Sequence, residues 1–326
     1  MMTKTRLMIV MGGNFYFIFY FFNLVSFLSC GMFEGIMKIL AVGDFQGKFP
    51  ERLKKVLHSE SFDVLVVVGD VSGVDEWKPY IIDIFKRIKK GKSRLTPKEF
   101  FGNKKLKELE RKDFESCKII LKELNKLNKP VMLIFGNSDD GWYNHPTLRL
   151  SKKDMRVKKF MASMKNIAEI TYSHKGFKKF NFIGWGGYMD IEAYFKKSTF
   201  KAENEMIPIK MKRHKLSRTK LFKLLKKTNR NDLNNIFIFH YPPYGIFDKI
   251  KDKGNPMDGQ RTGIKFFGEA IKRYKPKVVL CGHMHEYQGM KKLYGVQVIN
   301  PGDAGEGKCA IVDINSEGQV KAKFFK

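Results

Sequence analysis

The sequence predicts an α/β fold, because short apolar runs alternate with basic stretches of helical character. The runs are rich in Val and Ile, and each ends in or just before Gly, Asp, Asn or His. Such an alternation is typical of strands and helices that share one core. The eight predicted strands are Lys38–Gly43, Val64–Gly69, Val131–Gly136, Phe180–Trp185, Ile236–His240, Val278–Gly282, Val296–Asn300 and Cys309–Ile314.

Continuous apolar strands are buried on both faces, so polar residues at their carboxyl ends are expected on loops at one rim of the sheets. Between the strands, Asn103–Asn128 predicts a helix with an apolar stripe. The stripe consists of Leu106, Leu109, Phe114, Ile120, Leu121 and Leu124. The most basic stretches, Lys86–Lys105 and Ile207–Arg230, fall between strands and are expected to be surface insertions.

The charge of the chain indicates a polyanionic partner. Lys and Arg number 62 against 33 Asp and Glu, which gives a formal charge of +29. Such a surplus attracts nucleic acid or nucleotides, although a Lys-rich surface also arises from compositional drift. The composition excludes a fibrous, disordered or disulfide-rich chain.

The four cysteines form no C-x-x-C pair and are expected to be reduced thiols of a cytoplasmic protein. They are Cys30, Cys117, Cys281 and Cys309.

Residues 1–36 precede the predicted domain, which covers residues 37–326. Residues 7–33 are an uncharged run of 27 residues, long enough to span a bilayer. Three interpretations are open: a start placed too far upstream, with Met37 as the natural start; a membrane anchor; or a signal peptide, for which Phe27–Cys30 is a poor cleavage site. The anchor would place the protein at a membrane instead of free in the cytoplasm.

Polar motifs follow five of the predicted strands. They are Asp44-x-Gln46, Gly69-Asp70, Gly136-Asn137-Ser138-Asp139, His240 before Tyr-Pro-Pro, and Gly282-His283-Met284-His285. Each motif alone is compatible with an ordinary turn or a strand-end histidine. Together, their carboxylates, amides and imidazoles suit Mn²⁺, Fe or Zn²⁺, and two ions sharing a bridging carboxylate can activate water for attack on a phosphoester.

This ordered set resembles the calcineurin-like metallophosphoesterases, whose pattern is D-x-H, G-D, G-N-H-D/E, H and G-H-x-H. The resemblance covers the chain from Lys38 onward and implies a sandwich of two mixed β-sheets flanked by helices. It also implies two metal sites joined by Asp70. The first is formed by Asp44, Gln46 and His285, and the second by Asn137, His240 and His283. Asp70, Asn137, Ser138 and Asp139 are the implied catalytic residues.

Two residues depart from the family pattern. Gln46 stands where the family has a histidine ligand, so the first metal site is expected to bind more weakly. Ser138 stands where the family usually has the histidine that stabilises or protonates the leaving oxygen. The expectation is a preference for esters with good leaving groups, or help from another residue such as His145.

Two further features have competing interpretations. Residues 302–308 match the spacing of a phosphate-binding P-loop, but they lack the final Ser/Thr and lead into a strand instead of a helix, so that interpretation is rejected. Trp142 and Tyr143 either stack a base at the rim of the site or pack their loop onto the domain.

The resulting hypothesis is a metal-dependent phosphoesterase, a phosphodiesterase or nuclease rather than a monoesterase, that uses hydroxide activated by two metal ions. Mn²⁺ is the first expectation for the cofactor, with Fe or Zn²⁺ as alternatives. A protein Ser/Thr phosphatase is disfavoured because Val-Ser-Gly-Val follows Asp70. The alternative is a catalytically weakened member that binds nucleic acid or a protein. No pattern indicates an oligomeric state.

Overall fold

The computed structural model describes residues 37–139, 142–143, 155–195, 201–229 and 234–326. Two six-stranded sheets form its centre. The first has the order β12-β11-β1-β2-β3-β4. Its strands are β1 (Met37–Val42), β2 (Val64–Val67), β3 (Val131–Leu133), β4 (Ile167–Glu169), β11 (Cys309–Ile314) and β12 (Val320–Phe325). β1 to β4 are parallel, whereas β11 and β12 run antiparallel to their neighbours.

The second sheet has the order β5-β6-β7-β8-β10-β9. It contains β5 (His174–Phe177), β6 (Phe180–Trp185), β7 (Asn234–Phe239), β8 (Val278–Cys281), β9 (Gly289–Leu293) and β10 (Val296–Asn300). Its four inner strands are parallel, and β5 and β9 are antiparallel edges. All eight predicted strands are therefore present, and β4, β5, β9 and β12 are additional.

Apolar side chains fill the space between the sheets and both outer faces. Ile39 of β1 and Ile238 of β7 belong to the cluster between the sheets. Leu40, the neighbour of Ile39, points the other way, into a cluster with α4. On the far face of the second sheet, the ring of Phe239 stacks on that of Phe267 at 4.0 Å.

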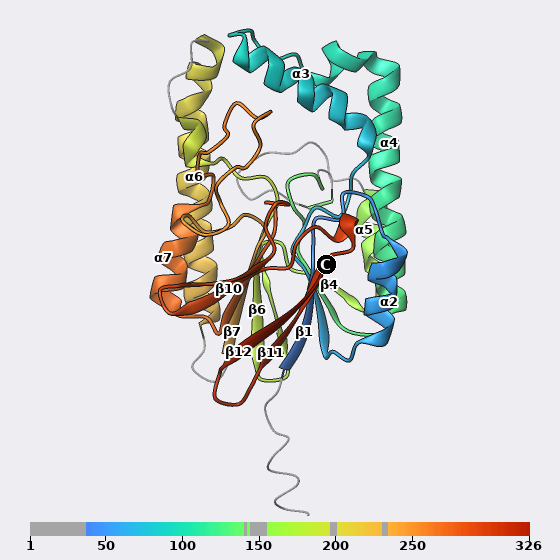
Figure 1. Ribbon diagram of the computed structural model, residues 1–326, viewed down its shortest axis with the longest axis vertical. Helices are drawn as coiled ribbons and strands as arrows, with labels where there is room; N and C mark the ends of the chain where they lie inside the picture. The colour runs from blue at the N-terminus through green and yellow to red at the C-terminus, as the bar shows by residue number, and fades with distance from the viewer. Residues whose placement is uncertain (1–36, 140–141, 144–154, 196–200, 230–233) are drawn as a thin grey trace, which may run out of the picture.

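Helices cover the outer face of each sheet, so the predicted sandwich of two mixed sheets flanked by helices is confirmed (Figure 1). The helices are α2 (Glu51–Ser59), α3 (Lys78–Lys89), α4 (Pro97–Lys126), α5 (Met155–Ala162), α6 (Lys201–Thr228) and α7 (Lys265–Tyr274). Short 3₁₀ turns are η1 (Asp75–Trp77), η2 (Glu192–Phe195) and η3 (Ala304–Glu306). The last of these leads directly into β11, in agreement with the rejection of a P-loop at 302–308.

The predicted helix Asn103–Asn128 corresponds to most of α4, which begins earlier, at Pro97. Thr96 caps this earlier start together with Glu99. Gly102 then has a non-helical φ of 74°, so a kink separates the first turn from the rest. The apolar stripe faces the first sheet, because Leu109, Ile120, Leu121 and Leu124 are buried.

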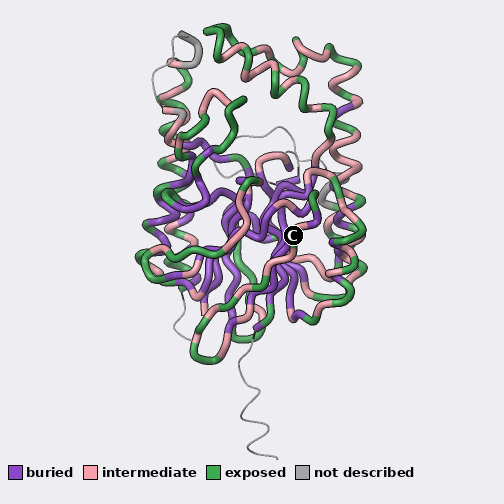
Figure 2. The backbone as a smooth tube through the Cα atoms, viewed as in Figure 1, coloured by how far each residue is buried: buried purple, intermediate pink, exposed green. Residues whose placement is uncertain are grey.

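The two most basic stretches form helices outside the sheets. In Figure 1, α3 lies at the top of the molecule, above the loops at the strand ends. It runs between the upper ends of α6 and α4. α3 has no buried residue, as the exposed and intermediate colours of Figure 2 show. Aromatic contacts hold α3 in place instead. The ring centres of Trp77, just before α3, and of Tyr80 within it lie 5.4 and 5.8 Å from that of Phe101 in α4.

The hydrophobic run 7–33 lies outside the described residues. Among the residues that are described, no helix is long and apolar enough to cross a membrane.

Candidate metal centre

The loops after β1, β2, β7 and β8 are bonded to one another at the rim of the sandwich. The backbone N–H of Asp44 donates to the carbonyl of Gly69 at 2.8 Å, and that of Gly282 donates to the carbonyl of His240 at 3.0 Å. The N–H of His283 lies 3.0 Å from both carboxylate oxygens of Asp44. Segments far apart in the sequence are thus fixed in one small volume.

Glycines before the predicted ligands are required by this close approach. A Cβ atom on Gly136 would lie 2.1 Å from Oδ1 of Asp70, and one on Gly282 would lie 2.7 Å from Oδ2 of Asp44. Contacts this short do not occur with real side chains, so only glycine lets the loops meet.

Four predicted ligands have an uncommon backbone conformation. Asp44, Gln46, Asp70 and His283 have φ values of 57°, 49°, 51° and 70°. Residues other than glycine rarely adopt this left-handed region, and those that do gather at functional sites. The backbone therefore turns sharply where each of these side chains enters the centre.

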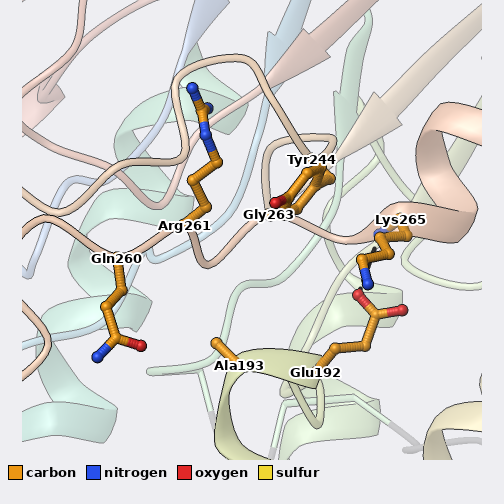
Figure 3. Close-up of a pocket in the computed structure, with 7 residues that line it drawn as sticks. All are labelled: Glu192, Ala193, Tyr244, Gln260, Arg261, Gly263 and Lys265. Carbon is orange, nitrogen blue, oxygen red and sulfur yellow. Dashed lines mark hydrogen bonds between the residues drawn. The ribbon is translucent and has the colours of Figure 1, made fainter.

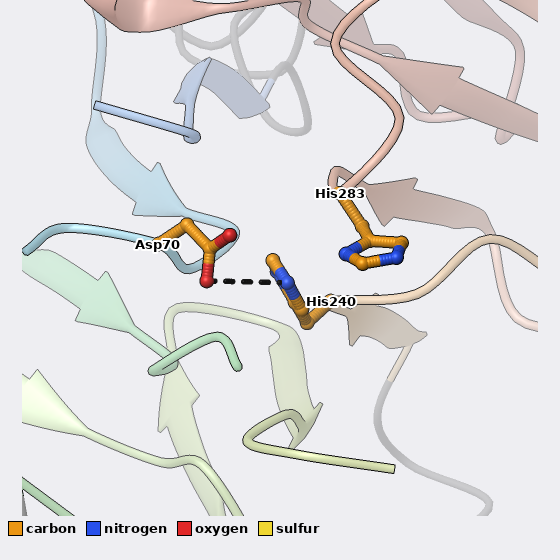
Figure 4. Close-up of side chains that lie close together, drawn as sticks. All are labelled: Asp70, His240 and His283. Atoms are coloured by element: carbon orange, nitrogen blue, oxygen red, sulfur yellow. Dashed lines mark ion pairs between the residues drawn. The ribbon is translucent and has the colours of Figure 1, made fainter. Parts of the chain in front are cut away.

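The first group of potential ligand atoms comes from Asp70, His240 and His283, whose nitrogen and oxygen atoms lie within 4.8 Å of one another (Figure 4). Nδ1 of His240 lies 2.9 Å from the carbonyl of Val68. When Nδ1 donates its proton there, Nε2 is left as a lone-pair atom. This atom is 2.9 Å from Oδ1 of Asn137 and 3.4 Å from Oδ1 of Asp70.

Lone pairs that face one another at these distances are repulsive unless a cation or an added proton lies between them. His283 supplies a further neutral donor, because burial lowers its pKa to about 3. The side chains of Asn137, His240, His283 and Asp70 therefore have the chemistry and the arrangement to hold a divalent cation.

The second group consists of Asp44, Asp70 and His285, again with atoms within 4.8 Å of one another. Nε2 of His285 is 3.8 Å from Oδ1 of Asp44, and the side-chain amide of Gln46 is 3.1 Å from Oδ2 of Asp70. Burial raises the pKa of Asp44 to about 6 in spite of the nearby His285. A bound cation would offset that cost of burial.

Asp70 belongs to both groups, which is the position of a bridging ligand. Burial acts to raise its pKa, but His240, His283 and the N–H of Ser138 more than compensate, so the pKa of Asp70 is lowered. The N–H of Ser138 donates to Oδ1 of Asp70 at 2.9 Å. Asp70 is therefore a carboxylate at neutral pH.

Asp139 and Ser138 lie beside the two groups in different environments. Asp139 is fully buried, and its oxygens accept the N–H groups of Ser72 and Gly136, each at 2.7 Å. Burial and the charge of Asp70 raise its pKa to about 7. The hydroxyl of Ser138 is buried beside the carboxylate of Asp70, whose pKa it helps to lower, and it makes no well-aligned hydrogen bond among the described residues. A polar atom left in this way indicates that it binds something else.

Two neighbouring predictions have different outcomes. Trp142 and Tyr143 are buried, and Trp142 stacks on Phe114 at 4.7 Å, so these rings pack their loop onto the core and do not form a platform at the rim. His145, the suggested replacement acid, lies outside the described residues. Asp303 of the rejected P-loop is 3.8 Å from His285, where the turn after β10 meets the centre.

Comparison with known families agrees with this geometry. A profile described as metallophosphoesterase, calcineurin superfamily, matches residues 32–324. The chain belongs to this superfamily. No curated protein matches the sequence. A metallophosphoesterase assignment supports metal-dependent hydrolysis of a phosphoester, and the two groups of Asp and His residues fit it.

Solved structures show the same fold. One crystal structure has 21% sequence identity and a TM-score of 0.59, covering 89% of this chain and 100% of that one. The structure of the protein TT1561 from Thermus thermophilus has 15% identity and a TM-score of 0.51, with 88% and 98% of the two chains covered. At these identities, the likeness concerns the metallophosphoesterase fold.

Proposed function

We propose that this metallophosphoesterase is a phosphodiesterase that cleaves nucleotide or nucleic-acid substrates with two divalent ions, Mn²⁺ being the first candidate. The observation that carries the proposal is that the buried carboxylate of Asp70 belongs to both groups of ligand atoms. A carboxylate in that position can hold two ions close enough to act on one phosphoryl group.

In this proposal, the residues at the rim form two metal sites that share one bridging ligand. Asp44, Gln46 and His285 hold one ion, Asn137, His240 and His283 hold the other, and Asp70 joins them. Bound ions would neutralise charge on the phosphoryl group and lower the pKa of the attacking water.

Two side chains complete the proposed site without holding an ion. The hydroxyl of Ser138, which makes no well-aligned hydrogen bond among the described residues, donates to the substrate. Asp139 keeps the Gly136 loop against Ser72 and is a positioning residue.

The basic helices favour a polyanionic substrate. α3 carries Lys86, Arg87 and Lys89 in its last turn, and the first half of α6, which approaches α3 in Figure 1, carries Lys210 and Lys212. α3 also approaches the loop after β7, because Nζ of Lys89 donates to the carbonyl of Lys253 at 2.9 Å. Lys and Arg side chains gathered near a phosphoesterase centre attract the phosphate backbone of a nucleic acid.

One experiment tests the proposal: hydrolysis of a single-stranded oligonucleotide and of bis-p-nitrophenyl phosphate, with Mn²⁺ or with a chelator. Both esters should be cleaved only with metal. The KM for the oligonucleotide should rise on the order of 10²-fold between 50 and 200 mM salt, because cations on the protein displace counterions from the backbone. The KM for the small diester should change little.

Matched charge reversals locate the effect. The double variant Lys86→Glu/Lys90→Glu at the carboxyl end of α3 should weaken oligonucleotide binding. By contrast, Lys38→Glu/Lys321→Glu, exposed at the ends of β1 and β12 remote from the centre, should not. A flat salt response would exclude a nucleic-acid backbone as substrate. Salt-sensitive binding without metal-dependent turnover of either ester would favour the alternative, a binding module.

A further inference from the structure

A pocket lies beside the loop that follows His240, and no motif in the sequence pointed to it. Its volume is about 310 Å³, at the lower end of the range for small-molecule sites. The lining residues are Glu192, Ala193, Tyr244, Gln260, Arg261, Gly263 and Lys265 (Figure 3). They come from η2, the loop between β7 and α7, and the first residue of α7.

The two ends of the loop are held together to form the pocket. Tyr244 N–H donates to the carbonyl of Ile264 at 3.2 Å, and a Cβ atom on Gly263 would lie 2.7 Å from the Cα of Tyr244. Glycine is therefore required where the returning chain passes Tyr244. The pocket has fixed backbone walls, which favours recognition of a defined group.

Two cations and an aromatic ring dominate the pocket. Tyr244 is 44% exposed. The guanidinium carbon of Arg261 lies 6.0 Å from its centre, and Nζ of Lys265 lies 5.6 Å from it. Both distances allow cation–π attraction, so the ring keeps the two charges at the pocket.

Arg261 and Lys265 differ in whether a neighbouring carboxylate already neutralises their positive charge. Arg261 is oriented by Asp248, whose buried carboxylate accepts from Nη1 at 2.6 Å. The carboxylate of Glu192 is 3.2 Å from Nε2 of His214 and also receives the N–H of Lys265. No ion pair within the described part of the chain involves the ammonium group of Lys265. Lys265 therefore has its charge available for an anion.

The pocket adjoins the metal centre through two short connections. Tyr244 is four residues after His240, and four residues span at most about 14 Å. On the other side, Thr262 lies between Arg261 and Gly263, and its hydroxyl contacts the sulfur of Met284 at 3.8 Å. Met284 separates the predicted ligands His283 and His285, so the segment that lines the pocket packs directly against the loop that carries both of them.

We propose that this pocket is an anion subsite that binds a second phosphate of the substrate, the one next to the phosphodiester being cleaved. Lys265 and Arg261 bind its oxygens, and Gln260 can donate a further hydrogen bond. The substrate class is therefore an ester with at least two phosphates joined through one sugar, as in an oligonucleotide. This inference rests on the proposed phosphodiesterase function and specifies its substrate.

The test compares two esters that differ by one phosphate: the p-nitrophenyl ester of thymidine 5′-phosphate, and the same ester with an added 3′-phosphate. With Mn²⁺, the wild type should show a kcat/KM about tenfold higher for the second ester, as expected for one charge-assisted contact. Lys265→Gln should reduce that ratio toward one, and Lys265→Arg should retain it. Lys272→Gln, an exposed position two turns along α7, should leave the ratio unchanged.

A second measurement separates the subsite from the activity: calorimetric binding of thymidine 3′,5′-bisphosphate in EDTA. Lys265→Gln should weaken this binding about tenfold, and Lys272→Gln should not. If neither ester is hydrolysed but this difference in binding is found, the subsite stands and the proposed activity fails. If both esters are hydrolysed equally well and the bisphosphate binds wild type and Lys265→Gln alike, or binds neither, the subsite is wrong and the activity stands.

Discussion

Replacing Asp70 by asparagine is expected to lower metal-dependent hydrolysis of bis-p-nitrophenyl phosphate by about 10³-fold, because charge stabilisation by metal ions contributes several kcal/mol and each 1.4 kcal/mol is tenfold in rate. The substitution keeps the shape of the side chain and removes the charge shared by the two groups of ligands. The measurement is kcat/KM over a range of Mn²⁺ concentrations, since saturation with metal should not restore the rate.

Asp313→Asn is the matched control. Asp313 lies in β11 opposite Lys38, at the end of β1 remote from the centre, and this variant should retain wild-type activity. Thermal unfolding in EDTA should show that Asp70→Asn is folded, while the stabilisation by added Mn²⁺ should be reduced. Activity within a factor of three of wild type would exclude Asp70 as the bridging ligand.

The second large effect is expected at Ser138. A serine hydroxyl has no pKa near neutrality, so it is a poor proton donor to a leaving oxygen, and general acid catalysis contributes about 10²–10⁴-fold. The wild type should therefore cleave aryl diesters much faster than alkyl diesters. Ser138→His should raise turnover of an alkyl phosphodiester far more than that of bis-p-nitrophenyl phosphate.

Ser138→Asn is the control for size and hydrogen bonding, because it adds no titratable group and should not give the selective increase. The wild type alone also tests the idea, through rates for a series of esters of increasing leaving-group pKa. A flat dependence on that pKa would mean that another residue already donates the proton. His145 would then be the first residue to replace.

The sequence predicted the buried strands well and the edge strands poorly. The eight predicted strands are continuous apolar runs because helices or the other sheet cover both of their faces. β5, β9 and β12 are edge strands with exposed residues, and they contain Lys and His where the inner strands have Val and Ile. Such strands have no apolar run to detect.

The grouping of residues at the candidate metal centre was predictable, because these residues occupy short motifs at strand ends. The structure brings together Asp44, Gln46, Asp70, His240, His283 and His285, with Asn137 beside His240. Their roles as ligands remain a prediction. The adjoining pocket was not predictable, because Tyr244, Arg261 and Lys265 belong to no motif. They come together because the 241–264 segment folds back and pairs with itself.

The most direct test of the proposed two-metal centre is a crystal soaked with Mn²⁺ and examined by anomalous scattering. Two peaks about 3.5–4 Å apart are expected on either side of Asp70. The peak at Asn137, His240 and His283 should have the higher occupancy at limiting Mn²⁺, because Gln46 gives the other site an amide in place of an imidazole. A single ion that does not contact Asp70, or no bound ion at saturating Mn²⁺, would contradict the proposed two-metal centre.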